Sequence, residues 1–162
     1  MIEIERYETA NRLGIEVVDT DTMGCISADI IKNARTWIDL ASGRGEFSLA
    51  LIRENSLLNV WNLEKRSDYV EITDKAKNLL PPAESVRIHN VNGKIEKVAR
   101  GLYACEGILQ NLMDAASLHC YEPGKFSEKA VVNAISYVLK PEGAAIITLD
   151  SEIDNYKNFL KY

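Results

Sequence analysis

The chain of 162 residues contains few of the residues that mark specialised classes of protein: three cysteines, two histidines and four prolines. The cysteines are widely spaced and odd in number, and no C-x-x-C pair occurs. This argues against a structural zinc site and against a disulfide framework. We therefore expect reduced thiols, a cytoplasmic protein and no bound metal.

Long apolar runs and an excess of basic charge are also missing. No stretch approaches the length of a membrane span, and the opening Met-Ile-Glu-Ile-Glu is too acidic for a signal peptide. The net charge of −5 argues against non-specific nucleic-acid binding, which needs a basic face. The composition, 46% hydrophobic and 27% charged, is that of one soluble globular domain with a core of its own.

Apolar periodicity and turn residues predict strands that alternate with helices. The expected strands are Thr36–Leu40, Leu57–Leu63, Val86–Val91, Ile108–Asp114 and Ala144–Leu149. The expected helices are 3–13, Ser27–Ala34, Glu46–Glu54, Asp68–Leu80, Phe126–Leu139 and Ser151–Tyr162, with a further helical face from Ile95 to Leu109.

This alternation implies one α/β domain over residues 1–162, with a parallel sheet covered by helices on both faces. Right-handed crossovers favour the strand order 3-2-1-4-5. We divide the domain into an N-terminal extension (1–35), a core (36–150) and a C-terminal helix (151–162). Lys140–Gly143 is predicted as the turn before the last strand, because proline ends the helix and glycine permits the reversal.

The stretch Trp37–Gly45, W-I-D-L-A-S-G-R-G, carries the strongest chemical signal. An apolar strand contains the acid Asp39 near its end, and a turn of small residues follows. Such a turn lets backbone N–H groups approach a ligand closely, at the edge where open α/β sheets bind ligands. A tight turn without a ligand is the alternative. The dinucleotide pattern G-x-G-x-x-G is not met, because Ser48 stands at the third glycine position.

With these residues the chain resembles the class I S-adenosylmethionine-dependent methyltransferases, whose first motif is an acid, a glycine-containing turn and a helix. The resemblance implies a Rossmann-like three-layer α/β sandwich and S-adenosylmethionine as cofactor. In the family the turn packs against the ligand, and the acid reaches its amino-acid end. This assigns Asp39 and the turn residues to the cofactor site; those turn residues are Ala41, Ser42, Gly43 and Gly45.

Glu64 and Asn92 complete the expected cofactor site. Glu64 closes the second strand, where a carboxylate accepts strong hydrogen bonds from ribose hydroxyls; a solvated charge in Glu64-Lys65-Arg66 is the alternative. The family often has Asp after strand three, bonded to the adenine amino group. Asn92 stands there, and its side-chain oxygen can accept the same bond, although Asn92-Gly93 is also a turn signal.

Asp114 and His119 are the candidates for acceptor chemistry. Asp114 is expected at the carboxyl edge of strand four, across from Gly43, where a carboxylate can orient a substrate or take its proton. His119 is expected to be the stronger base, because imidazole titrates near neutrality; a merely packed or exposed histidine is the alternative. Metal-dependent O-methyltransferases carry a second Asp where this chain has Ala116, so no metal is predicted.

These residues predict methyl transfer from S-adenosylmethionine to an acceptor that the sequence does not identify. Two alternatives stay open: a degenerate methyltransferase fold that acts as a binding or assembly module, and a small NAD-dependent oxidoreductase. Family members continue past strand five into strands six and seven, whereas this chain reaches Tyr162 with room for one helix. We therefore expect strand five to form an open edge that needs cover. A second copy that pairs there to make a homodimer is the favoured solution; edge strands from the N-terminal region and shielding by the last helix are the alternatives.

Overall fold

The computed structural model describes residues 28–121 and 127–149. Its strands are β1 (Thr36–Leu40), β2 (Asn59–Glu64), β3 (Ile88–Asn92), β4 (Met113–Tyr121) and β5 (Leu139–Leu149). Its helices are α3 (Ala28–Asn33), α4 (Glu46–Glu54), α5 (Ser67–Asn78), α6 (Pro82–Ser85) and α7 (Glu128–Val138), with short 3-10 helices η1 (Ile95–Arg100) and η2 (Ala104–Glu106). None of the helices in these ranges is long and apolar enough to cross a membrane.

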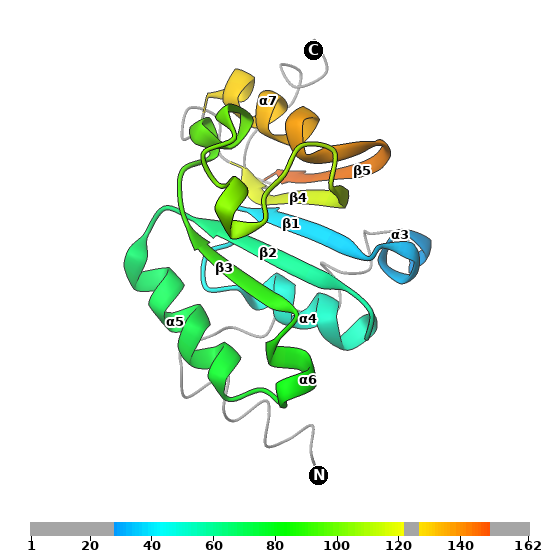
Figure 1. The fold of residues 1–162 in the computed structure, drawn as a ribbon, viewed down its shortest axis with the longest axis vertical. Coiled ribbons are helices and arrows are strands. Elements are labelled where there is room, and N and C mark those ends of the chain that lie inside the picture. The colour runs from blue at the N-terminus through cyan, green and yellow to red at the C-terminus, as the bar shows by residue number, and fades with distance from the viewer. Residues whose placement is uncertain (1–27, 122–126, 150–162) are drawn as a thin grey trace.

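All five strands pair in parallel in the order β3-β2-β1-β4-β5 (Figure 1). This confirms the predicted fold class and strand order. Because the strands are parallel, their carboxyl ends lie at one edge of the sheet, and the turn after β1 lies between the ends of its two neighbours. In the described part of the chain β5 pairs with β4 alone, and pairing of a second copy there stays a prediction.

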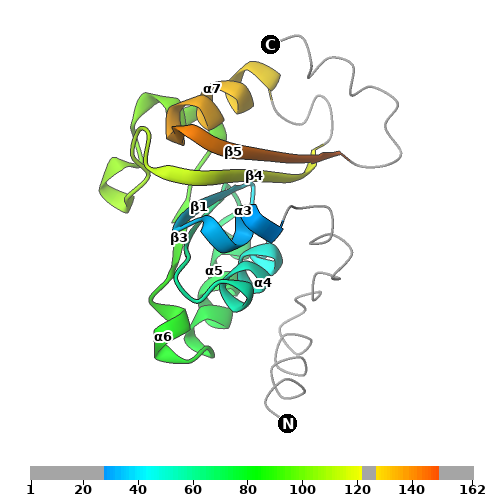
Figure 2. The ribbon, with the colours of Figure 1, turned by 90° about the vertical axis from the view of Figure 1, so that its right-hand side faces the viewer.

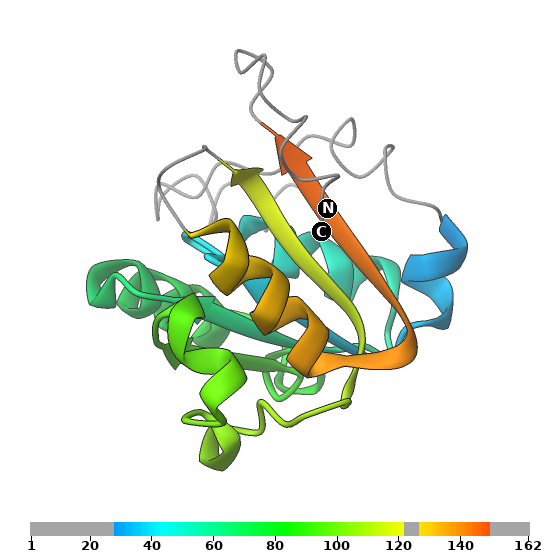
Figure 3. The same cartoon turned by 90° about the horizontal axis from the view of Figure 1, so that it is seen from above.

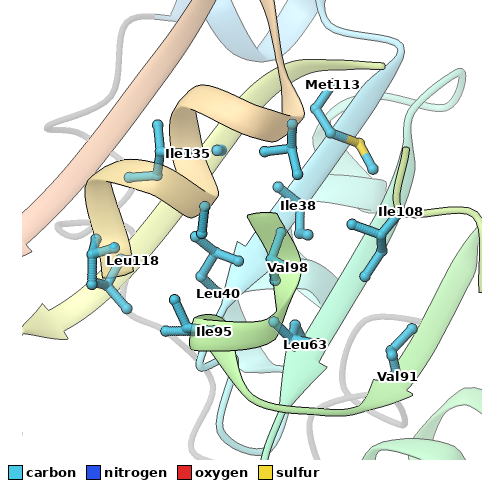
Figure 4. Close-up of a cluster of buried hydrophobic side chains, with 14 residues drawn as sticks. Ile38, Leu40, Leu63, Val91, Ile95, Val98, Ile108, Met113, Leu118 and Ile135 are labelled. Carbon is cyan, nitrogen blue, oxygen red and sulfur yellow. The ribbon is translucent and has the colours of Figure 1, made fainter. Parts of the chain in front are cut away.

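Helices cover both faces of the sheet (Figure 2). One core cluster joins α3, α4 and α5 to the sheet through side chains such as Trp37 and Leu51. The other joins η1 and α7 to the opposite face, with Ile38 and Val131 among its members (Figure 4). The neighbours Trp37 and Ile38 are both 0% exposed, which is the mark of a parallel strand buried on both sides.

Strand four is the main error of the sequence interpretation. It was expected at Ile108–Asp114, whereas β4 spans Met113–Tyr121. The apolar positions from Ile95 onward suggested one helix, but that segment forms the two short 3-10 helices η1 and η2. Gly101 (φ 67) and Gly107 (φ 85) end them in the left-handed conformation that glycine adopts without steric cost.

The last described strand also differs from expectation. β5 begins directly after α7 and includes Lys140–Gly143, which was predicted as a turn. The pairing with β4 shifts register across that segment, from Met113 opposite Leu139 to Ala115 opposite Ala144. Figure 3 shows α7 running beside β4, with β5 on the other side of that strand. The helices expected at 3–13 and 151–162 lie outside the described residues.

Asp114 lies at the opposite edge of the sheet from the one predicted. It is at the amino end of β4, where its carboxylate accepts hydrogen bonds from the backbone N–H groups of Arg35 (2.7 Å) and Thr36 (3.0 Å). It also accepts bonds from Thr36 Oγ1 and Lys140 Nζ. Partial burial alone would raise its pKa, but the bonds from Lys140, Arg35 and Thr36 outweigh burial and lower it. Asp114 therefore cross-links the amino ends of β1, β4 and β5.

Removing this cross-link is expected to destabilise the fold. Asp114→Ala should lower the free energy of unfolding by about 2 kcal/mol, because the N–H groups of Arg35 and Thr36 lose their charged acceptor. Urea denaturation measures the change. Glu142→Ala, an exposed carboxylate on the same edge, is the matched control and should leave the midpoint unchanged. Equal midpoints for wild type and Asp114→Ala would show that the cross-link does not contribute to the stability of the fold.

Candidate functional site

The turn between β1 and α4 has an unusual backbone. Ala41 (φ 56), Gly43 (φ 58) and Gly45 (φ 81) all take the left-handed conformation. Glycine does so freely, whereas the side chain of Ala41 makes it cost about 1 kcal/mol. The turn is tied to its neighbour, because the N–H of Ser42 donates to the carbonyl of Leu63 at the end of β2 (3.2 Å).

The two glycines of the turn serve different purposes. A Cβ added at Gly45 would lie 2.6 Å from Thr73 Cγ2, so this glycine lets α5 pack directly against the turn. A Cβ added at Gly43 would meet nothing nearer than Glu46 Oε2, at 4.0 Å. The backbone at Gly43 is therefore open to a ligand on its own side.

A row of hydrogen bonds beneath Gly45 joins four elements. Ser48 of α4 donates to Asn62 Oδ1 of β2, and Asn62 Nδ2 donates to Asn90 Oδ1 of β3 (2.9 Å). Asn90 Nδ2 then donates to Asp74 Oδ1 of α5 (2.7 Å). Ser48 and Asn62 are buried, so the row satisfies polar groups within the core and fixes the start of α4 against α5.

Glu64 points toward the turn, as the sequence predicted. Its Oε2 accepts a hydrogen bond from the N–H of Gly43 (3.1 Å), and its Oε1 accepts one from the N–H of Arg66 (2.9 Å). The residue is 6% exposed. A carboxylate offers about four lone-pair positions, so these two bonds hold the group in place and leave capacity for ligand hydroxyls.

Asp39 is buried beneath the turn and is 2% exposed. Ser117 Oγ, on the neighbouring β4, donates a hydrogen bond to its Oδ1 (2.8 Å). Burial raises the pKa of Asp39 to about 7; the bond from Ser117 opposes that rise, and the charges of Glu46 and Glu64 add to it. Ser117 was missed because its pairing with Asp39 depends on the position of strand four.

Asn92 lies opposite Glu64 in the pairing of β3 with β2. Its Nδ2 donates to the carbonyls of Glu64 (3.2 Å) and Lys65 (3.3 Å). These bonds use the amide nitrogen, so Oδ1 is the atom that can accept a hydrogen bond from a ligand amino group. The structure thus brings Asn92 to the same edge as Asp39 and Glu64.

His119 also reaches this edge, in contrast to Asp114. It follows Ser117 on the same face of β4, because side chains alternate along a strand. Its ring packs against Phe47, with 4.0 Å between ring centroids. Burial lowers its pKa to about 4, which makes the imidazole neutral at pH 7 and a weaker base than the sequence suggested.

Ser42 places a hydroxyl in the turn that lacks an internal partner. The residue is 9% exposed, and its Oγ makes no hydrogen bond within residues 28–121 and 127–149. A buried hydroxyl without a partner costs about 1–3 kcal/mol. This is a polar atom that a bound ligand would satisfy.

Comparison with solved structures identifies the architecture. A protein of Galdieria sulphuraria assigned as a sarcosine dimethylglycine methyltransferase superposes with a TM-score of 0.61 and 16% identity, over 86% of this chain and 46% of that one. Geranyl diphosphate methyltransferase, solved with geranyl diphosphate and sinefungin, superposes with a TM-score of 0.61 and 12% identity, over 75% of this chain and 41% of that one. The chain has the methyltransferase fold. No family model and no curated protein matches the sequence.

Other proteins with the methyltransferase fold have been solved with ligands. The glycopeptide N-methyltransferase MtfA in complex with S-adenosylmethionine matches with a TM-score of 0.57 and 15% identity, over 88% of this chain and 52% of that one. MtfA has also been solved with sinefungin. This chain spans about half the length of these proteins, and identities this low establish the fold alone.

The two glycines of the turn are expected to respond differently to alanine. Gly43→Ala introduces a left-handed alanine into open space and should cost about 1 kcal/mol of stability. Gly45→Ala adds the clash with Thr73 and should cost about 1–3 kcal/mol more. Chemical denaturation of both variants measures the difference. Equal losses would mean that α5 moves away from the turn without cost.

The ionisation of Asp39 is expected to make stability depend on pH. Asp39 stays protonated in the folded chain up to about pH 7, whereas an Asp in the unfolded chain ionises near its ordinary pKa of 3.8. Between these values the unfolded chain binds fewer protons, so the free energy of unfolding falls as pH rises, by about 4 kcal/mol in total. Above about pH 7 this effect is complete.

Asp39→Asn should remove this dependence, because the amide does not titrate. The measurement is the difference in unfolding free energy between variant and wild type in urea from pH 5 to pH 8, in which the effects of other groups cancel. As pH rises, the unfolding free energy of Asp39→Asn should increase relative to that of wild type. A constant difference would contradict the assignment of a raised pKa to Asp39.

Proposed function

We propose that this chain binds S-adenosylmethionine at the carboxyl edge of the sheet and transfers its methyl group to an acceptor. The observation that carries the proposal is the convergence of buried Asp39 and Glu64 on a turn of small residues, with Gly43 bonded directly to Glu64. A pair of buried acids favours a cationic ligand, and a sulfonium ligand with an ammonium group meets that requirement. The methyltransferase fold supports the same ligand.

Each residue of the site has a proposed partner on the ligand. Asp39 binds the amino-acid end of the ligand, and Glu64 accepts hydrogen bonds from its ribose hydroxyls. Asn92 Oδ1 accepts from the adenine amino group. The residues of the turn lie against the methionine and ribose portions; they are Ala41, Ser42, Gly43 and Gly45. The unpartnered Ser42 Oγ supports the fit, because a polar ligand at the turn would give that hydroxyl a partner.

The chemistry that the cofactor supplies is a methyl group already activated by the sulfonium, open to in-line displacement by an O, N or S nucleophile. The contribution of the chain is then mainly orientation. His119 is proposed to hold the acceptor as a neutral imidazole, because its pKa of about 4 makes it a weak base. The location of Asp114 at the amino edge leaves no acceptor role for that residue.

A binding module without methyl transfer is the second candidate. It is favoured by one observation: the imidazole of His119 is held against Phe47 with a lowered pKa. The dinucleotide alternative is less favourable, because Asp39 beside the turn would repel a pyrophosphate; the position of Glu64 suits both kinds of ligand.

Titration calorimetry with S-adenosylmethionine and S-adenosylhomocysteine tests the proposal. We expect micromolar binding of both. Glu64→Gln should weaken binding about tenfold to a hundredfold, because a charged acceptor for the ribose hydroxyls is replaced by a neutral one. Glu71→Gln, an exposed carboxylate of α5 paired with Lys75, is the control and should bind as wild type does.

Three results would separate the alternatives. Absence of heat at millimolar concentrations of both ligands would overturn the proposal. Binding without turnover, for a panel of O, N and S acceptors, would favour the binding module. Protection in a thermal melt by NAD(H) but not by S-adenosylhomocysteine would favour the oxidoreductase.

A further inference from the structure

Two hydrogen bonds join Trp37, Ser117 and Asp39 across β1 and β4. Trp37 Nε1 lies 2.9 Å from Ser117 Oγ, and Ser117 Oγ lies 2.8 Å from Asp39 Oδ1. Trp37 and Ser117 are 0% exposed and Asp39 is 2% exposed. In the ladder Trp37 pairs with Ala115 and Asp39 with Ser117, so the backbone of the sheet fixes the relative positions of the three side chains.

The direction of this chain of bonds follows from the chemistry of its members. The indole N–H of Trp37 can donate and cannot accept, so Ser117 Oγ must be the acceptor of the first bond. A serine hydroxyl has one proton, which is then directed at Asp39 Oδ1. The carboxylate is thereby held by one oxygen, and Oδ2 is the atom that can face a ligand.

The charged groups around Asp39 would otherwise disfavour its ionised form. Glu46 of α4 and Glu64 of β2 add to the rise in pKa that burial causes. His119 of β4 is neutral at pH 7. In the turn, the guanidinium of Arg44 lies over the ring of Tyr69 on α5, 5.4 Å from its centroid. The hydroxyl of Ser117 is the hydrogen-bond donor that opposes these effects.

We infer that Ser117, held by Trp37, is a positioning residue that keeps Asp39 oriented and ionisable for a cationic group of the ligand. The inference rests on the proposed function, with the ligand's ammonium as that group. Binding of the ammonium transfers the Asp39 proton to solvent, so affinity rises with pH up to about the pKa of Asp39, near 7, and falls again at the higher pH where the ligand's ammonium loses its own proton.

The ionisation is measured in the ligand-free chain by ¹³C NMR of labelled Asp carboxyl groups, with Asp39 assigned through Asp39→Asn. We expect a wild-type midpoint near pH 7. Ser117→Ala should raise the midpoint by about one pH unit, because the carboxylate loses its donor. Trp37→Phe, which keeps Ser117 but removes its anchor, should give a smaller rise. Unchanged midpoints in both variants would overturn the inference.

Calorimetry with S-adenosylhomocysteine from pH 6 to pH 9 measures the consequence for binding. Wild-type affinity should rise about tenfold from pH 6 to about pH 8 and then fall as the ligand's ammonium loses its proton. Ser117→Ala should bind about fivefold more weakly than wild type at pH 7, and the ratio of the two affinities should approach one at pH 9. A merely structural role would lower affinity by one factor at every pH, and that result would refute the positioning role.

Two controls sharpen this test. 5′-Methylthioadenosine lacks the ammonium group, so its affinity should not change with pH. Ser48→Ala removes a buried hydroxyl bonded to Asn62 rather than to Asp39, and its pH profile should have the wild-type midpoint.

Failure of the inference and failure of the proposed function have different signatures. If wild type binds neither S-adenosylhomocysteine nor S-adenosylmethionine at any pH, the proposed function is wrong, while the NMR midpoints still show whether Ser117 controls Asp39. If wild type binds with a pH profile that Ser117→Ala shares, the proposed cofactor binding stands and the inference is wrong.

Discussion

The hydrogen bond from the N–H of Gly43 to Glu64 is the interaction on which the carboxyl edge depends. It joins the turn after β1 to the end of β2, and the second oxygen of the same carboxylate fixes the chain that leads into α5 through the N–H of Arg66. Because the acid that accepts this bond is also buried, it places negative charge against the turn. One carboxylate thus shapes the backbone and sets the electrostatics of the site.

Local departures from good packing and solvation gather at this same turn. Ala41 has a left-handed backbone, Ser42 has a buried hydroxyl without a partner in the described part of the chain, and Asp39 is a buried carboxylate beside further acids. Each of these costs stability. Strain and unsatisfied groups that cluster in one place are typical of ligand sites, where the ligand supplies the missing interactions. The rest of the described sheet is packed by apolar clusters on both faces.

The sequence predicted those parts of the fold that local signals determine. Thr36–Leu40 and Glu46–Glu54 have the predicted bounds, because an apolar strand, small turn residues and an amphipathic helix follow one another directly. Strand four was placed wrongly, because the spacing of the apolar residues from Ile95 onward is that of a helix. In the structure two glycines divide this segment into short 3-10 helices. Asp114 was therefore assigned to the wrong edge. Ser117 was missed for a related reason: its contact with Asp39 is non-local and depends on register.

The distinction between an enzyme and a binding module depends on the acceptor rather than on the cofactor site. An acceptor that must lose a proton before it attacks would need a stronger base than His119, whose pKa of about 4 reflects its burial against Phe47. An acceptor that is nucleophilic in its neutral form needs only to be oriented, since the sulfonium is already activated. A neutral imidazole held against an aromatic ring is suited to that second task. Under the proposed function, neutral amines or thioethers would therefore suit this site better as acceptors than hydroxyls would, and the same residues without an acceptor would make a binding module.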